Sequence, residues 1–531
     1  MEKKSFIRGA AILAVAGLIV KIIGAIYRIP LSNIIGSNGM SFYEVAYPYY
    51  SFLLVVSSAG LPTAISKMVS ERVTLGDYRG AHQVFRTAFR MLLIIGVVTS
   101  TLMFFGADLL VSGTPLPEAA LSLRALAPAL LLVSLMCAYR GYLQGLQLMT
   151  GTAVSQVVEQ VGKLGVGFAL ASALLSRGPQ YAAMGALIGV SISELMALVI
   201  IAVFFWSHKK ELRKAIKSAP KVQLPRIRRV AMGLLAIAIP VTIGASIMPI
   251  TGIVDANMIM TILIDINFTL SQAMSAFTAL RSYVTPLINM PAVLTAALAM
   301  SLVPAISGSM ARHDYKSVKR AARTGMKLAL LIGMPCAAGL FVLAKPIIGM
   351  LFTRLSEEQL LLAADLMHTA AIGVIFLSLV QTMTGVLQGM GKANVPVFNL
   401  IFGGILKVIT MLVLTRIPSI NIQGAAVSTV ACYAAAGILD TIYMVRKTGM
   451  KLQLWDVFGK PLVASGAMGL AVYLVYETLS KTGHRTLSTL AAVAIGVCVY
   501  GALLLLLKAF SEEDLSLIPG GSRLKKLLFR R

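Results

Sequence analysis

The chain contains 531 residues, of which 57% are hydrophobic and only 13% are charged, and its mean hydropathy is +0.84. Soluble domains are about 45–50% apolar and about 25% charged, so this composition excludes a soluble protein and predicts an all-α, polytopic membrane protein. The formal net charge of +26 could indicate a nucleic-acid-binding protein, but most basic residues fall between apolar segments, as in the cytoplasmic loops of membrane proteins. No nucleic-acid partner is therefore expected.

Fourteen transmembrane helices are predicted, because each span needs about 20 apolar residues. In chain order they lie near residues 6–35, 41–66, 87–110, 121–146, 152–175, 181–206, 229–256, 276–306, 325–350, 362–390, 394–415, 421–445, 457–479 and 486–509. Loops on the side of the N-terminus carry 34 Lys and Arg residues, whereas the opposite loops carry six. The positive-inside rule therefore places both termini in the cytoplasm. The cysteines lie inside apolar runs and the histidines are scattered, so no metal site is expected.

Short sequences recur in the same order in the two halves of the chain. Asp77-Tyr78-Arg79 returns as Asp314-Tyr315-Lys316, and Leu143-Gln144-Gly145 returns as Leu387-Gln388-Gly389. We therefore predict two six-helix lobes, residues 1–225 with a basic cytoplasmic linker and residues 226–450, followed by two additional helices and a basic cytoplasmic tail in 451–531. An even number of helices makes the repeats parallel, which is typical of alternating-access transporters with the substrate path between the halves.

Basic residues within the predicted helices are the candidate functional residues. Each costs about 2.5–3.5 kcal/mol at mid-bilayer, so we expect these side chains to face a watery cavity or to pair with acids. Basic residues outnumber acids in these helices, and Arg and Lys suit phosphate, so we predict an anionic, phosphate-bearing substrate. The predicted substrate-binding residues are Lys21, Arg28, Arg140, Gln144, Glu159, Lys163, Arg281 and Lys407.

Several of these residues have simpler interpretations. Glu159 and Lys163 are four residues apart and could neutralise each other, and Lys407 could extend to the membrane surface. Arg281 is predicted to share a helix face with Thr285. Four tyrosines near residue 48 favour an interfacial aromatic belt, although they could also stack on a sugar; they are Tyr43, Tyr47, Tyr49 and Tyr50.

Two stretches resemble a known family. The stretch from Lys21 to Gly36 resembles the first helix of the MurJ-type lipid II flippases, and Arg140-Gly141-Tyr142-Leu143-Gln144-Gly145 resembles the stage V sporulation protein B branch. These proteins belong to the multidrug/oligosaccharidyl-lipid/polysaccharide (MOP) exporter superfamily, which also contains the MATE-like antiporters. The resemblance implies fourteen helices in two V-shaped lobes, and movement of undecaprenyl-pyrophosphate-linked sugars from the inner to the outer leaflet.

The resemblance also implies roles for individual residues. Lys21 falls where the MurJ-type proteins carry a functional arginine, and Arg281 is placed like a cavity arginine. Asp255, Asn399 and Thr429 correspond to a sodium site of some members, so Na⁺ or H⁺ is a candidate coupling ion and no other cofactor is expected.

We therefore predict a flippase of the bacterial cytoplasmic membrane that carries a lipid-linked cell-wall precursor, most simply lipid II, by alternating access. Its expected partners are this lipid-linked oligosaccharide, membrane lipid and cell-wall synthesis enzymes. The alternatives are a flippase for a capsule, teichoic or exopolysaccharide unit, and a multidrug or cation antiporter of the same superfamily. An enzyme is not expected, because the outer loops offer few carboxylates and no catalytic spacing.

Overall fold

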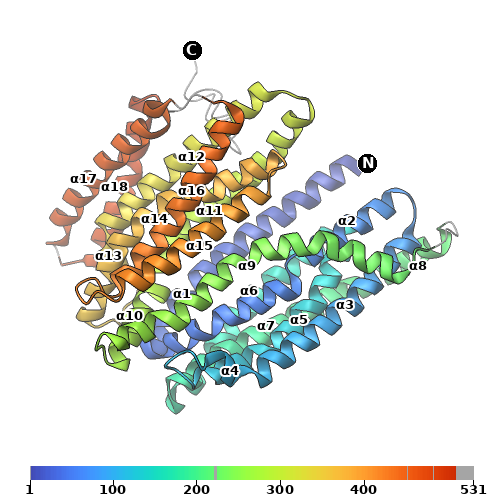
Figure 1. Cartoon of the computed structure of the whole chain (residues 1–531), viewed down its shortest axis with the longest axis horizontal. Helices are drawn as coiled ribbons and strands as arrows, with labels where there is room; N and C mark the ends of the chain where they lie inside the picture. Colours follow the sequence, from blue (N-terminus) through green and yellow to red (C-terminus); the bar gives the residue numbers. More distant parts are fainter. Residues whose placement is uncertain (1, 220–223, 451–452, 482, 510–531) are drawn as a thin grey trace. The chain divides into compact units, whose positions relative to one another are not determined.

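The computed structural model describes residues 2–219, 224–450, 453–481 and 483–509, and within its first helix the side chains at 2–15, 18, 21 and 25 lie outside the description. Every regular element in these residues is a helix, which confirms the predicted all-α fold class. The chain divides into two compact units, unit 1 (Met1–Thr261) and unit 2 (Ile262–Arg531) (Figure 1). The lobe boundary near residue 225 stays a prediction, and the tail from residue 510 lies outside the described residues.

The first unit contains both long and short helices. They are α1 (Glu2–Ser58), α2 (Leu61–Thr74), α3 (Tyr78–Phe105), α4 (Ala107–Val111), α5 (Ala119–Gly145), α6 (Met149–Leu174), η1 (Leu175–Arg177), α7 (Pro179–Ser207) and α8 (Lys209–Ser218). One helix, α9 (Ile227–Asp265), continues across the boundary between the units. Those of unit 2 are α10 (Leu270–Thr278), η2 (Ala279–Val284), α11 (Thr285–Ala311), α12 (Tyr315–Val342), α13 (Ala344–Leu351), α14 (Glu357–Gly389), α15 (Asn394–Leu414), α16 (Gln423–Thr448), η3 (Trp455–Gly459), α17 (Lys460–Ser480) and α18 (Arg485–Leu506).

Most of the long helices are membrane spans. Within the described residues, thirteen helices are long and apolar enough to cross a membrane. The first of them runs from Ile22 to Thr74, and its 53 residues far exceed the roughly 20 that one crossing needs. It contains the turn at Gly36, so it accounts for the first two predicted helices. The protein is therefore a multi-pass membrane protein with the predicted order of spans.

The longest helix, α1, is folded at Gly36, whose φ of 68° and ψ of −176° are not helical. In a straight helix, residues 28 and 44 would lie about 24 Å apart. Instead, Arg28 Nη1 lies 2.8 Å from Glu44 Oε1, so the two arms of α1 lie beside each other at these residues. Glycine adopts a positive φ without steric cost, and this freedom lets the chain reverse here.

One of the recurring sequences starts equivalent helices in the two units. Asp77 caps α3 by accepting a hydrogen bond from the Gly80 amide, at 2.7 Å. Asp314 caps α12 in the same way, accepting from the Ser317 amide at 3.0 Å. A carboxylate at this position satisfies a backbone donor that the helix leaves unpaired. The repeated Asp-Tyr sequence therefore marks a structural repeat.

The second recurring sequence ends equivalent helices in the two units. Gly145 is the last residue of α5, and Gly389 is the last residue of α14. The next residue donates to the carbonyl four positions back in both cases, from Leu146 to Tyr142 and from Met390 to Val386, each at 3.0 Å. The repeated Leu-Gln-Gly sequence therefore also marks a structural repeat.

The last two helices are anchored to α12. Lys327 of α12 is buried, and its Nζ lies 2.9 Å from Asp456 Oδ2. Lys460 Nζ lies 2.7 Å from the other oxygen of the same carboxylate. The Tyr500 hydroxyl of α18 donates to the Leu331 carbonyl of α12 at 2.8 Å. Helices α17 and α18 are therefore packed into unit 2.

Candidate functional site

The fold at Gly36 places an arginine against a fully buried acid. Glu44 has no exposed side-chain area, and its carboxylate pairs with the Arg28 guanidinium at 2.8 Å. The Arg28 guanidinium also lies over the Tyr47 ring, 5.7 Å from the centroid, and Tyr47 stacks on Tyr43. A buried carboxylate without a cation would be strongly destabilising, so the pair is part of the interior of unit 1. Sequence analysis missed Glu44.

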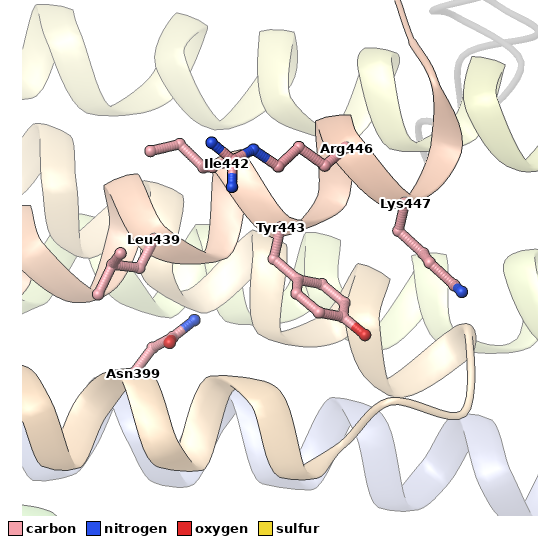
Figure 2. A pocket seen from close by; sticks show the side chains of 6 residues that line it. All are labelled: Asn399, Leu439, Ile442, Tyr443, Arg446 and Lys447. Carbon is pink, nitrogen blue, oxygen red and sulfur yellow. The ribbon is translucent and has the colours of Figure 1, made fainter.

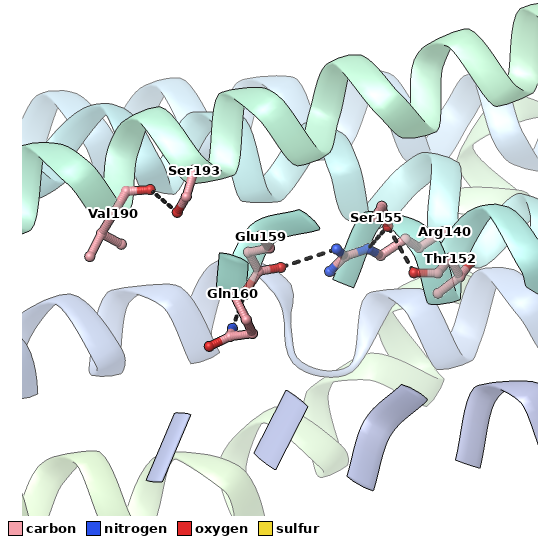
Figure 3. Close-up of polar contacts among 7 residues, drawn as sticks. All are labelled: Arg140, Thr152, Ser155, Glu159, Gln160, Val190 and Ser193. Carbon is pink, nitrogen blue, oxygen red and sulfur yellow. Dashed lines mark hydrogen bonds and ion pairs between the residues drawn. The ribbon is translucent and has the colours of Figure 1, made fainter. Parts of the chain in front are cut away.

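A second ion pair joins α5 to α6. These helices are connected by a tight turn, with Gln147 at a φ of 63°, so the last turns of α5 lie beside the first turns of α6. Figure 3 shows the Arg140 guanidinium reaching across: its Nη2 lies 3.1 Å from Glu159 Oε2, and its Nε donates to Ser155 Oγ at 3.0 Å. The other Glu159 oxygen accepts from Gln160 Nε2 at 3.1 Å. Glu159 therefore pairs with Arg140 and also acts electrostatically on Lys163, four residues further along α6.

Two further ionisable groups complete this region. Lys163 of α6 lies within electrostatic range of Arg28, Glu159 and Glu194, and Glu194 of α7 is buried. We call Arg28, Glu44, Arg140, Glu159, Lys163 and Glu194 the unit 1 polar cluster. It contains three cations and three acids, whereas the predicted excess of basic residues was counted over whole helices. Membrane-embedded charges are expensive and are retained for function, which makes the cluster the candidate site.

The remaining predicted residues of unit 1 have separate outcomes. Lys21 lies in α1, but its side chain is outside the described residues. Gln144 is half-buried in the last turn of α5. The aromatic belt is wrong for three of the four tyrosines, because Tyr43, Tyr49 and Tyr50 are buried in the interior of the unit.

In unit 2 the predicted cations lie on different helices. Lys407 is buried on α15, so it does not extend to the membrane surface. Arg281 lies in a π-helical turn, Ala279–Val284. There the Thr285 hydroxyl donates to the carbonyl of residue 280, five positions back, so the face predicted from α-helical spacing is shifted. Turns of this kind are frequent at functional sites, which keeps Arg281 a candidate.

The predicted cation ligands are divided between the units. Asp255 is buried in unit 1, whereas Asn399 and Thr429 belong to unit 2. Asn399 Nδ2 donates to Asp440 Oδ1 at 2.7 Å, and the Thr429 hydroxyl donates to a carbonyl of its own helix at 3.2 Å. A sodium site formed by these residues stays a prediction. Asp440 is the acid that the structure places beside Asn399.

Comparisons with known proteins agree with this architecture. The polysaccharide biosynthesis protein family matches residues 6–310, and the MatE family matches residues 256–413. Stage V sporulation protein B of Bacillus subtilis is 24% identical over 98% of this chain and 98% of its own length. The lipid II flippase MurJ of the same species is 26% identical, over 93% of this chain and 94% of its own.

A solved structure shows the same fold. The lipid II flippase MurJ in an inward closed conformation aligns with a TM-score of 0.70, covering 93% of this chain and 98% of that chain at 16% identity. Similarity at this identity establishes the fold alone.

Proposed function

This chain belongs to the polysaccharide biosynthesis protein family of the MOP exporter superfamily, and on that premise we propose that it is a flippase for a lipid-linked cell-wall precursor. The precursor that we favour is lipid II, because MurJ, a relative along nearly the whole chain, is a lipid II flippase. The precursor would cross by alternating access, and no covalent chemistry by the protein is required.

The unit 1 polar cluster is the observation that carries this proposal. Three cations within spanning segments would cost about 8–10 kcal/mol if they were unpaired at mid-bilayer. Arg28 and Arg140 each have a carboxylate partner, at 2.8 and 3.1 Å. A pyrophosphate offers the same acceptor chemistry as these carboxylates and more negative charge, so it can replace them as the partner of both guanidinium groups.

Exchange of partners gives the cluster a role in both halves of the transport cycle. With substrate bound, the guanidinium groups of Arg28 and Arg140 hold the pyrophosphate, and Tyr47 lies ready to stack on the attached sugar. The displaced Glu44 and Glu159 carboxylates take up protons in this state, so that no buried acid is left charged without a cation. After release, Glu44 and Glu159 pair with the same arginines again. The empty protein can then return without unpaired charge in the membrane.

Two other substrate classes remain as alternatives within the superfamily. Similarity to stage V sporulation protein B and to the polysaccharide biosynthesis family supports a teichoic, capsular or exopolysaccharide precursor. The MatE match and the equal numbers of cations and acids in the cluster support a cation or drug antiporter. For the flippase as well as for these alternatives, Na⁺ or H⁺ is the proposed coupling ion, with Asp255, Asn399 and Thr429 as its candidate ligands.

The test is flipping by the purified full-length protein in liposomes. Lipid II starts in the inner leaflet, and a toxin that cuts only outer-leaflet precursor reports its arrival. A hydrogen bond to a charged group contributes about 1.5–3 kcal/mol, so Arg28→Gln with Arg140→Gln should slow flipping at least tenfold. The control, Arg213→Gln with Lys214→Gln, removes the same charge from the exposed face of α8 and should flip normally.

The same liposomes distinguish the alternatives. Flipping of a teichoic or capsular precursor but not of lipid II would show that the proposed substrate is wrong and would leave the proposed mechanism in place. Ion-driven uptake of a fluorescent cationic drug without precursor flipping would refute the flippase. Flipping of lipid II at the wild-type rate by the double variant would refute the role of the cluster.

A further inference from the structure

A cavity of about 420 Å³ lies along one face of α16 in unit 2. Its lining consists of one residue of α15 and five residues of α16: Asn399, Leu439, Ile442, Tyr443, Arg446 and Lys447. The α16 residues are spaced by three, four, seven and eight positions, so they form a single stripe of that helix. We call this cavity the α15–α16 groove, and Figure 2 shows its lining side chains.

The chemistry of the α15–α16 groove changes along its length. Leu439 and Ile442 make its inner part apolar, and the tyrosine ring of Tyr443 lies between them and the helix end (Figure 2). Arg446 and Lys447, which are both exposed, supply two positive charges in the last turn of α16. A ligand that fits this groove therefore has an anionic head and an apolar body.

The surface around the groove is apolar and exposed. On α15, Phe398 is 68% exposed and Phe402 is 54% exposed, and Ile438 of α16 is also exposed. Both helices are long and apolar enough to span a membrane, and exposed apolar side chains of this kind suit contact with acyl chains. The positive-inside rule predicts that Arg446 and Lys447 lie at the cytoplasmic leaflet, whose anionic lipids attract basic side chains.

We propose that the α15–α16 groove binds an anionic phospholipid of the inner leaflet. Figure 2 shows the Arg446 guanidinium turned toward Ile442 and the Lys447 side chain pointing away from it. On binding, the Arg446 side chain swings toward Lys447 so that both contact the phosphate, and one acyl chain runs over Leu439 and Ile442. Each basic side chain near an anionic surface strengthens binding about fivefold, so the pair should favour an anionic over a zwitterionic lipid about thirtyfold. The site is separate from the unit 1 polar cluster, so it can fail without affecting the proposed function.

The buried acid near the groove does not prevent anion binding. Asp440 is 1% exposed, and its carboxylate accepts a hydrogen bond from Asn399, whose amide lines the groove. The amide therefore stands between the carboxylate and the ligand. A structural explanation for Arg446 and Lys447 is their favourable interaction with the dipole of α16, because they lie in its last turn. That interaction does not account for the cavity beside them.

The experiment measures which lipid contacts the groove in the full-length protein. Trp206 and Trp455 are replaced by Phe, and Ile442→Trp places one tryptophan in the lining. Quenching by brominated phosphatidylglycerol and brominated phosphatidylcholine in mixed liposomes then gives the relative affinity of the two lipids. We expect a preference of about thirtyfold for phosphatidylglycerol, falling to near unity in Arg446→Gln with Lys447→Gln.

Controls keep the result specific. Lys209→Gln with Lys210→Gln removes the same charge from exposed positions on α8 and should leave the preference unchanged. In a second experiment, Leu439→Trp is introduced into the protein that keeps Ile442, so that the larger side chain fills the groove. Native mass spectra of this variant should show fewer bound phosphatidylglycerol molecules than those of the wild type.

Equal quenching by the two lipids, or a preference that survives the Arg446 and Lys447 substitutions, would overturn the proposal. Displacement of phosphatidylglycerol by stoichiometric undecaprenyl phosphate would also overturn it, by assigning the groove to the carrier lipid.

Discussion

The fold of α1 at Gly36 leads to the sharpest prediction, the effect of Gly36→Ala. With a φ of 68° and a ψ of −176°, Gly36 occupies a region that is essentially restricted to glycine. A Cβ at this position would meet no atom within 4 Å, so alanine adds no clash. The cost is therefore purely conformational, about 1–3 kcal/mol.

This cost acts against the conformation that joins Arg28 to Glu44. A difference of 1–3 kcal/mol shifts an equilibrium by about 5- to 150-fold. Gly36→Ala should therefore populate forms in which the arms of α1 open and the 2.8 Å ion pair is lost. Flipping should slow by a comparable factor, because the cluster then lacks one of its cation pairs.

The assay is the distance between spin labels at Ile22 and Val56, which lie on the two arms and are both exposed. Labelling uses a background without the four native cysteines. Gly36→Ala should lengthen and broaden the distance distribution. Gly165→Ala is the matched control, because its Cβ also meets nothing within 4 Å but its backbone is helical. An unchanged distribution and flipping rate in Gly36→Ala would refute the reasoning.

Three further predictions follow from other contacts. Glu44→Gln alone should lower the free energy of unfolding of the purified protein by about 3 kcal/mol, and adding Arg28→Gln should restore part of this loss. A double-mutant cycle of denaturant unfolding measures the recovery, and no recovery would show that the two side chains are not coupled. Hydrogen bonds from Ser317 lower the pKa of Asp314, so the charged carboxylate stabilises the start of α12 at pH 7. This contribution is lost as the pH falls from about 3.9, the ordinary pKa of an aspartate, through the lowered pKa. Hydrogen exchange of the Ser317 amide should become faster over that pH range in the wild type, but not in Asp314→Asn. Asp456→Asn should loosen α17 and α18 from α12, and protease cleavage after residue 453 should become faster; an unchanged rate would argue against the ion-pair anchor.

The order of helices could be predicted from the sequence because an apolar run of membrane length is a local signal. The Asp77 and Asp314 caps are equally local, since each needs only residues within one helical turn. The ion pair between Arg28 and Glu44 is different, because it depends on a reversal of the chain between them. A lone acid in an apolar run was the available signal for Glu44, and combined with Gly36 it predicts such a reversal.

The charge of the candidate site could not be predicted for the same reason. Counting cations along single helices gave an excess of positive charge, whereas the folded unit pairs cations on α1 and α5 with acids on α1 and α6. Likewise, the π turn around Arg281 breaks the spacing on which the predicted polar face depended. Periodicity identifies which residues are unusual, but the partner of each one depends on the tertiary fold.

Pairing within the unit 1 polar cluster limits how any charged substrate can be carried. If Arg28 and Arg140 were unpaired in the empty protein, its return would move about two charges through the membrane, at about 2.5–3.5 kcal/mol each. Glu44 and Glu159 remove this cost, but the substrate must then compete with two carboxylates already in place. A monovalent anion would gain little by that exchange, whereas a pyrophosphate can engage both guanidinium groups at once. The cluster therefore favours substrates whose charge spans two arginines, and inorganic pyrophosphate should inhibit flipping at concentrations at which chloride has no effect.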